Sequence, residues 1–320
     1  MPDNRTQMRA FAMLGLVMLF WAGNSIVGRA VRDDIPPFIL AFMRWSGAFL
    51  IVLPFAVKGL WRDRAALLKG WKIMLVLGVL GVGAFNALVY LGLHYTTATN
   101  ALLLQAAIPA VVMVLDFLFF RTRADPVQAG GVVLSILGVA TIVFQGNPAA
   151  VLKLHFGMGD GLILTAVAVW AIYTVLLRLK PPVSPVSFIA ATFGLGVLTT
   201  APLAISEWQA GEAIAWSMPV ASALLYVMVL PSLASYFIYN WATAQVGPAR
   251  AGQAITLMPL FGALLSTMLL GEALHSYHMA GMGLILGGIV VGAYATLRKG
   301  SPGRKGSAGA QKAGPLEDQA

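Results

Sequence analysis

Few side chains in this sequence have the types and spacing that catalysis requires. Glu272, His275 and His278 form an E-x-x-H-x-x-H string, but a metal site in a helical bundle needs a second Glu-x-x-His on another helix. Ser25 has no histidine at a matching depth to act as its base. Cysteine and a Walker-type phosphate loop are both absent. We therefore predict no catalytic residue, no metal, no cofactor and no enzyme activity, with an intramembrane enzyme as the alternative of a different class.

Amide and aromatic side chains are better suited to binding a solute than to changing it. Asn86 and Tyr90 align, at an offset of 150 residues, with Tyr236 and Asn240, so the two residue types are exchanged. Each pair is spaced i and i+4, which places both members on one helix face. A second interpretation stays open, because such residues also tie helices together or form interfacial belts. The candidate substrate-binding residues are Trp21, Asn24, Asn86, Tyr90, His94, Gln105, Trp170, Tyr173, Tyr236, Tyr239, Asn240, Trp241 and Gln253.

Three further residues interrupt apolar stretches. Arg44 lies inside one of them, where an unpaired charge costs several kcal/mol. It must face protein or water, either as a structural anchor or as the contact for a substrate carboxylate. Pro109 and Pro259 fall inside two other stretches, where a missing N–H and a ring clash kink a helix. We predict them to be gating hinges, with a static bend as the alternative.

The elements that position these residues are apolar helices. The chain is 59% hydrophobic and 10% charged, whereas a soluble domain is about 45–50% apolar and about 25% charged. A bilayer core about 30 Å thick takes about 20 apolar residues in a helix, and ten stretches fit. We predict an all-α polytopic membrane protein with ten transmembrane helices over residues 9–28, 36–57, 71–94, 98–119, 127–144, 159–179, 185–206, 218–245, 249–270 and 276–297.

The basic residues predict the orientation of these helices. Of the 21 Lys and Arg, seventeen lie in connections on one side of the membrane, and Arg29, Arg32 and Lys153 lie on the other. Positively charged loops stay cytoplasmic, so we expect both termini in the cytoplasm and the chain in the inner (plasma) membrane. The net charge of +9 then reflects topology, and we predict the lipid bilayer and a small-molecule substrate, not nucleic acid, as partners. The oligomeric state stays unknown.

The two halves of the chain repeat one another. Trp21 aligns with Trp170 at an offset of 149 residues, and Pro109 aligns with Pro259 at 150. Five helices per repeat is an odd number, so the second repeat enters the membrane from the opposite side, giving two inverted five-helix repeats. Such folds bind substrate near the midplane and expose it to each side in turn. The predicted parts are an N-terminal segment 1–8, repeats 9–144 and 159–297, an outer loop 145–158 and a disordered cytoplasmic tail 298–320.

Several short motifs carry a family resemblance. The segment Phe20-Trp21-Ala22-Gly23-Asn24, the run Pro37-Phe38-Ile39-Leu40-Ala41-Phe42-Met43-Arg44-Trp45, and Pro259 with Leu270-Gly271-Glu272 and Gly287-Gly288 resemble the drug/metabolite transporter superfamily, most of all its ten-span EamA-type branch. The first half departs from the pattern, because Arg121-Thr122 stands in place of the Gly271-Glu272 pair.

The substrate is predicted less sharply than the family. The Trp and Tyr residues among the spans make the chain similar to bacterial exporters of aromatic amino acids. The resemblance implies a carrier that exports small amphipathic metabolites, aromatic or other amino acids, by alternating access. A carrier for another metabolite or for a xenobiotic stays open as the alternative within transport.

Overall fold

The computed structural model describes residues 4–121, 126–144, 146–147, 157–246 and 254–299, and within these ranges the regular structure is helical. A helical segment lies over each of the ten predicted stretches. The first half contains α1 (Asn4–Ala30), α2 (Pro37–Lys69), α3 (Trp71–Gly78), η1 (Val79–Ala84), α4 (Phe85–Tyr95), α5 (Ala98–Gln105), α6 (Ile108–Phe120) and α7 (Pro126–Val143). The second half contains α9 (Met158–Leu176), η2 (Leu177–Leu179), α10 (Pro185–Gln209), α11 (Met218–Met228), η3 (Val229–Ala234), α12 (Ser235–Val246), η4 (Ile255–Leu257), α14 (Met258–Leu270) and α15 (Ser276–Lys299).

Seven segments of the described chain are long and apolar enough to cross a membrane, judged by length and composition alone. Among the other segments, Met258–Leu270 is a shorter apolar helix. The largest difference from the predicted bounds is in α2, which continues from the predicted end at residue 57 to Lys69. No glycine or proline follows residue 59 until Gly70, so the charged residues after the apolar stretch extend the same helix.

Two long segments are interrupted by π-helices at equivalent positions. η1 and η3 are 150 residues apart, and each joins two α-helices of one segment. In η1, Gly81 and Gly83 leave room for Tyr173 and Thr199, whose side chains a Cβ would meet. In η3, Pro231 lacks the N–H that a regular α-helix would use. Different residues therefore produce the same local widening in both halves.

Pro109 and Pro259 lie at helix beginnings. The first occupies the initial turn of α6, after a break between Gln105 and Ile108, and the second occupies the initial turn of α14, after η4. A proline is tolerated in the first turn because its missing N–H has no intrahelical partner there. Both prolines therefore follow a short non-α step at a helix beginning, where the sequence predicts a kink inside a helix, and their role as gating hinges stays a prediction.

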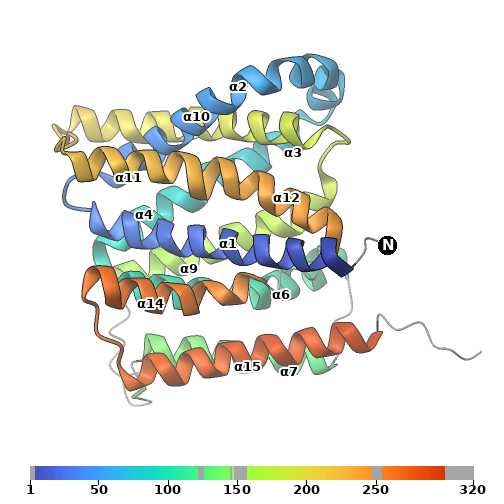
Figure 1. The fold of residues 1–320 in the computed structure, drawn as a ribbon, viewed down its shortest axis with the longest axis vertical. Coiled ribbons are helices and arrows are strands. Elements are labelled where there is room, and N and C mark those ends of the chain that lie inside the picture. Colours follow the sequence, from blue (N-terminus) through green and yellow to red (C-terminus); the bar gives the residue numbers. More distant parts are fainter. Residues whose placement is uncertain (1–3, 122–125, 145, 148–156, 247–253, 300–320) are drawn as a thin grey trace, which may run out of the picture.

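The two halves interlock in the bundle (Figure 1). Helix α1 contacts α12 and α14, and its counterpart α9 contacts α4 and α6. Helices α7 and α15 form a pair at one edge, with Gly138 beside Gly281 and Gly288 beside Gly131, so the two helices are antiparallel. A Cβ on Gly138 would lie 2.7 Å from the Gly281 carbonyl oxygen. Small residues permit this close approach. In lipid, where the hydrophobic effect does not favour helix contacts, the resulting van der Waals packing stabilises the pair.

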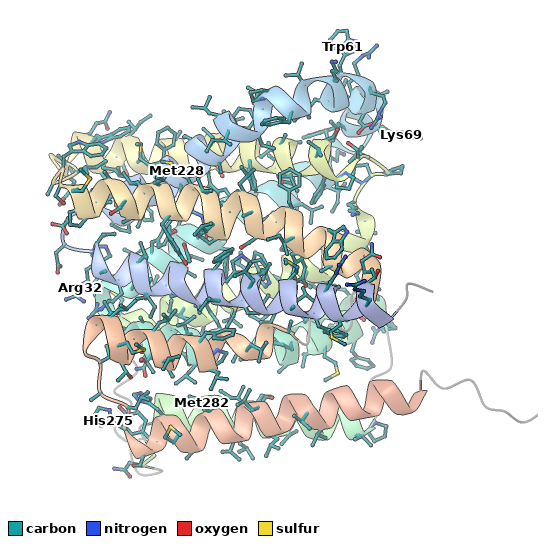
Figure 2. The ribbon with its side chains drawn as sticks, in the orientation of Figure 1. Arg32, Trp61, Lys69, Met228, His275 and Met282 are labelled. Carbon is teal, nitrogen blue, oxygen red and sulfur yellow. The ribbon has the colours of Figure 1, made fainter. Side chains whose placement is uncertain are left out.

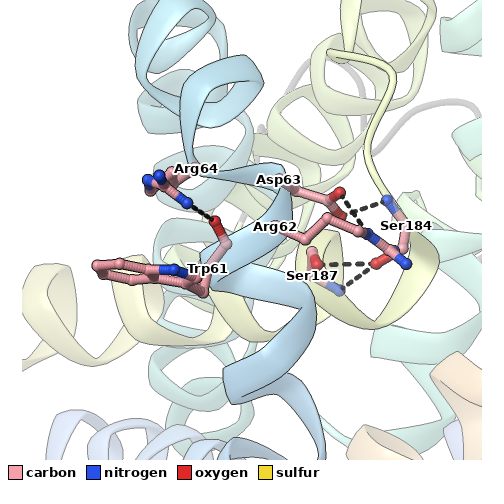
Figure 3. A network of polar contacts seen from close by, with 6 residues as sticks. All are labelled: Trp61, Arg62, Asp63, Arg64, Ser184 and Ser187. Atoms are coloured by element: carbon pink, nitrogen blue, oxygen red, sulfur yellow. Dashed lines mark hydrogen bonds and ion pairs between the residues drawn. The ribbon is translucent and has the colours of Figure 1, made fainter.

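Helices α2 and α10 form a second antiparallel pair that is closed at both ends. Near the end of α2, Asp63 Oδ2 accepts the backbone N–H of Ser184, 2.9 Å away, at the N-cap of α10 (Figure 3). Near the end of α10, the Glu207 carboxylate accepts the backbone N–H groups of Phe38, at 3.2 Å, and Ile39, at 2.8 Å, at the start of α2. Each helix therefore caps the other with a carboxylate, where the helix dipole favours negative charge.

The bundle has two distinct ends. Arg32 and His275 lie at one end, and Trp61 and Lys69 lie at the opposite end (Figure 2). The N-terminus and the end of α15 both lie at the same end as Lys69. The structure does not describe residues 148–156 of the predicted outer loop or residues 300–320 of the predicted tail.

Candidate functional site

A cavity lies among the helices near the middle of the bundle's long segments. Its wall comes from α1, α2, α4, α5, α6, α9, α12, η4 and α14. The lining residues are Trp21, Asn24, Arg44, Phe85, Asn86, Gln105, Ile108, Trp170, Tyr236, Ile255 and Met258. Elements from both halves of the chain therefore build one site.

Arg44 is the charged member of this wall, and its side chain is 3% exposed. Its Nε donates to Ser232 Oγ, 2.6 Å away. Its Nη1 faces three oxygens, those of Asn24 at 2.9 Å, Asn86 at 2.7 Å and Tyr90 at 2.9 Å. The guanidinium also lies 4.6 Å from the ring centroid of Trp45. Neutral groups thus solvate this buried cation, with no carboxylate among its described partners.

The remaining nitrogen of Arg44 has no such partner. Nη2 forms no hydrogen bond to any described residue, and yet it is not among the fully enclosed polar atoms without a partner, which are Trp45 Nε1 and Ser46 Oγ. Arg44 lines the cavity, and Nη2 is the guanidinium nitrogen that the described protein leaves without a hydrogen bond there. A guanidinium carries two N–H groups on this atom, so two donors remain for a bound molecule.

The partners of Arg44 are themselves held in place. The Tyr90 hydroxyl donates to Asn24 Oδ1, 2.7 Å away, and Asn86 Nδ2 donates to the Val82 carbonyl oxygen in η1, 3.3 Å away. Ser232 lies in η3 and donates to the Val227 carbonyl oxygen. Both π-helices therefore contribute to the network around Arg44, as π-helical turns often do at functional sites.

Aromatic rings form the other wall of the cavity. Trp21 and Trp170 meet edge to face with centroids 6.3 Å apart, and Trp21 meets Tyr236 at 6.5 Å. Phe85 lies 4.6 Å from Trp170. The Trp21 indole N–H donates to the Pro231 carbonyl oxygen in η3. This bond fixes the ring and occupies its N–H, so Trp21 offers the cavity its apolar surface. Such rings offer apolar faces and edges to an organic solute.

Most lining residues fall into pairs related by the repeat. Trp21 with Trp170, Asn86 with Tyr236, Gln105 with Ile255, and Ile108 with Met258 each differ by 149 or 150 residues. The residue types are nevertheless unequal, because the polar lining residues Asn24, Arg44, Asn86 and Gln105 all belong to the first half. The polar, cationic side of the cavity therefore comes from the first half, whereas both halves supply its aromatic and apolar residues.

The structure brings six of the predicted site residues to the cavity wall: Trp21, Asn24, Asn86, Gln105, Trp170 and Tyr236. Tyr90 lies behind Arg44, and Tyr173 and Tyr239 lie behind the two tryptophans at 5.0 Å and 5.3 Å between centroids. His94 lies outside the cavity near the end of α4, where its carbonyl oxygen accepts from Arg29. Trp241 is 44% exposed, whereas Gln253 and the Asn240 side chain lie outside the described residues.

Sequence reasoning overlooked part of the wall. Phe85, Ile108, Ile255 and Met258 line the cavity, yet as ordinary apolar residues of membrane helices they carry no polar signal. Ser232 carries no sequence signal either, because a single hydroxyl usually bonds to its own helix. The position of Ser232 relative to Arg44 depends on η3, and a π-helix has no simple sequence pattern.

The E-x-x-H-x-x-H string belongs to a helix junction. The Glu272 carboxylate accepts the backbone N–H groups of Ala98 and Thr99, both at 3.0 Å, at the start of α5. His278 Nε2 lies 2.8 Å from Asn100 Oδ1, and its Nδ1 accepts from the His275 backbone. These side chains therefore join the α14–α15 connection to the start of α5.

Comparisons with known proteins agree on a single family. The model of the EamA-like transporter family matches the chain twice, over residues 8–144 and 157–293. An uncharacterized transporter of Archaeoglobus fulgidus is 30% identical over 90% of this chain and 96% of its own length. The uncharacterized transporter YetK of Bacillus subtilis is 25% identical over 90% of this chain and 87% of its own.

The fold also resembles that of solved structures, among them a crystal structure with a TM-score of 0.63 at 16% sequence identity. The similarity covers 92% of this chain and 99% of that chain.

Proposed function

Because this chain belongs to the EamA-like transporter family and is therefore a multi-pass membrane transporter, we propose that it exports small amphipathic metabolites, aromatic or other amino acids, by alternating access. The observation that carries the proposal is the cavity with two unlike walls. A polar wall around Arg44 suits a charged or hydrogen-bonding end, and the rings of Trp21 and Trp170 suit an apolar end.

An inverted repeat of five plus five spans supports alternating access. The family model matches each half once, and the antiparallel pairs α2 with α10 and α7 with α15 each join equivalent helices of the two halves. Antiparallel equivalent helices are what a pseudo-two-fold axis in the membrane plane requires. On this proposal the ten helical segments cross the membrane, and the cavity lies at the repeat interface.

The orientation follows from the positive charges. One end of the bundle contains Lys69, the start of α1 and the end of α15, and it carries most of the Lys and Arg. On this proposal that end faces the cytoplasm, and the chain lies in the inner membrane. The opposite end, with Arg32 and His275, faces outward. The breaks before Pro109 and Pro259 adjoin the lining residues Ile108 and Met258, so a change at these hinges would reshape the cavity directly.

Transport by purified protein tests this proposal. Proteoliposomes are loaded with the twenty amino acids, one labelled species at a time, and release is followed over time. We expect saturable release of aromatic species unchanged, with Trp170→Ala reducing the rate about tenfold through lost contact with the ring. Ser46→Ala, whose hydroxyl has no partner among the described residues, serves as the control. Absence of release for every amino acid would reject the substrate class, and a new chemical product would favour an enzyme.

A further inference from the structure

We propose that the cavity is a carboxylate-binding site that prefers organic monoanions to zwitterions. Arg44 Nη2 and Asn24 Nδ2 donate the hydrogen bonds to the bound carboxylate. This inference rests on the proposed function and moves its preferred substrates, within small amphipathic metabolites, from amino acids to aromatic and other apolar carboxylates without an ammonium group. It follows from three features of the described residues: the free donors of the cavity, its charge, and the repulsion that an ammonium group would meet beside Arg44.

The two free donors belong to neighbouring residues of the cavity wall. Asn24 Oδ1 accepts from both Arg44 Nη1 and the Tyr90 hydroxyl, so the orientation of this amide is determined by two donors. Its Nδ2 then points away from them, and no described residue accepts from it. Because Asn24 lines the cavity next to Arg44, one carboxylate oxygen can bind Nη2 while the other binds Nδ2.

The cavity charge selects an anion. All lining residues apart from Arg44 are neutral, and the groups bonded to Arg44 are neutral as well. Every Asp and Glu of the described chain lies near a helix end or in a connection; Asp63, Glu207 and Glu272 cap helices, and Asp116 pairs with Arg178. A buried cation without a counter-ion is unfavourable, and a substrate carboxylate supplies the missing charge.

An ammonium group gains much less here. It would share the cavity with Arg44, so the two like charges repel in a site of low dielectric. The faces of Trp21 and Trp170 can attract a cation, but cation–π attraction is weaker than a charged hydrogen bond to a carboxylate. The amide oxygens of Asn24 and Asn86 already accept from Arg44, which leaves the Gln105 side-chain oxygen as the amide acceptor for an ammonium group. A zwitterion therefore gains the carboxylate contacts and loses part of that gain through its ammonium.

A matched ligand series on the wild-type protein tests this inference without requiring transport. The four probes share a phenyl ring and a short chain: 3-phenylpropanoate, phenylalanine, 3-phenylpropanamide and phenethylamine. Binding to detergent-purified protein is measured by titration calorimetry or by the shift in melting temperature. We expect 3-phenylpropanoate to bind about tenfold more tightly than phenylalanine and the amide, with phenethylamine weakest. Equal or tighter binding of phenylalanine, equal binding of the amide, or binding by none of the four would overturn the proposal.

Two variants identify the group that is responsible. Arg44→Gln removes the charge, and we expect it to abolish the preference for 3-phenylpropanoate over its amide. Ser46 lies two residues after Arg44 in α2, and its hydroxyl has no hydrogen-bond partner among the described residues. Ser46→Ala should therefore keep that preference. If Arg44→Gln does not fold, the wild-type series still decides the question. A protein that binds the anion but releases no amino acid from liposomes would contradict the amino acid part of the proposed function and leave this inference standing.

Discussion

Single side chains in the cavity wall have divided tasks. Arg44 donates three of its N–H groups to protein oxygens, and its Nη2 has no hydrogen-bond partner among the described residues. One residue can therefore both anchor the helices and contact a substrate. Tyr90 is fully buried behind it and contacts no cavity surface of its own. Its hydroxyl accepts from Arg44 and donates to Asn24, which makes Tyr90 a positioning residue for both proposed carboxylate donors.

Tyr90→Phe tests this positioning role. Loss of the hydroxyl leaves Arg44 Nη1 and Asn24 Oδ1 each with one fewer partner in a buried site, so we expect unfolding to become easier by about 1–3 kcal/mol. We also expect the preference for 3-phenylpropanoate over its amide to fall. Thermal unfolding in detergent and ligand titration measure the two effects. Tyr173→Phe is the matched control, because the described structure gives its hydroxyl no hydrogen bond, and equal stability losses in both variants would contradict the expectation.

Pairs of helices carry the architecture that surrounds the cavity. The pair α7 and α15 depends on glycines, whereas the pair α2 and α10 depends on carboxylate caps at both ends. The α7–α15 pair lies at the edge of the bundle and contributes no lining residue to the cavity. Substitutions in the α7–α15 pair should therefore change the stability of the protein without changing its affinity for substrate.

Gly288→Ala should loosen the α7–α15 pair. Its Cβ would collide with the Gly131 carbonyl oxygen and with Ser135, and overpacking of this kind costs about 1–3 kcal/mol. Gly283→Ala on the same helix is the control, since nothing lies within 4 Å of its Cβ. We expect a clear fall in melting temperature for the first variant and no fall for the second. An unchanged melting temperature in Gly288→Ala would show that the two helices are free to separate.

The caps of α2 and α10 should bias the cavity toward opposite openings. Asp63→Asn weakens the cap at the proposed cytoplasmic end, and Glu207→Gln weakens the cap at the proposed outer end. We expect the first to increase cavity access from the cytoplasm and the second to increase access from outside. A single cysteine at Ile108 in this cysteine-free chain reports access through maleimide labelling of vesicles of either orientation. The same labelling rate in both variants would contradict a gating role for the caps.

The whole molecule places its charges asymmetrically, which makes its orientation testable. Ala65→Cys, exposed near the end of α2, should react with an impermeant maleimide only from the cytoplasmic side. Gln209→Cys, exposed at the end of α10, should react only from outside. Intact cells and inside-out vesicles give the comparison. Labelling of Ala65→Cys in intact cells would reverse the proposed topology.

Energy coupling also belongs to the molecule as a whole. No Asp or Glu among the described residues lines the cavity, so no carboxylate is available there to carry a proton with the substrate. Export of a monoanion then moves one negative charge, and an inside-negative potential favours it by about 2.3 kcal/mol per 100 mV. We expect a potassium diffusion potential, and not a pH gradient, to drive uphill movement of 3-phenylpropanoate in proteoliposomes. Uphill movement driven by a pH gradient alone would contradict this.

Much of the helix arrangement was predictable from the order of residues alone. Apolar runs of about 20 residues can satisfy their backbone in lipid only as helices, and helices lie over the predicted stretches in the described chain. Seven of these helical segments are long and apolar enough to cross a membrane, and the count of ten spans stays a prediction. The recurrence of Trp21 at Trp170 and of Asn86 opposite Tyr236 indicated a shared cavity, because the period of a helix determines which side chains share a face. These properties are local or periodic, and they need no knowledge of what packs against what.

The division of labour within the cavity depends on contacts between distant segments. Arg44 left two interpretations open, because only the placement of Ser232, 188 residues away, together with Asn24 and Asn86, shows which of its nitrogens is left free. The π-helices that bring Ser232 and Asn86 to it arise from glycines in one half and a proline in the other, so no common sequence pattern marks them. Hydrogen-bond saturation and close packing are properties of the assembled bundle, and they become defined only when all segments are in place.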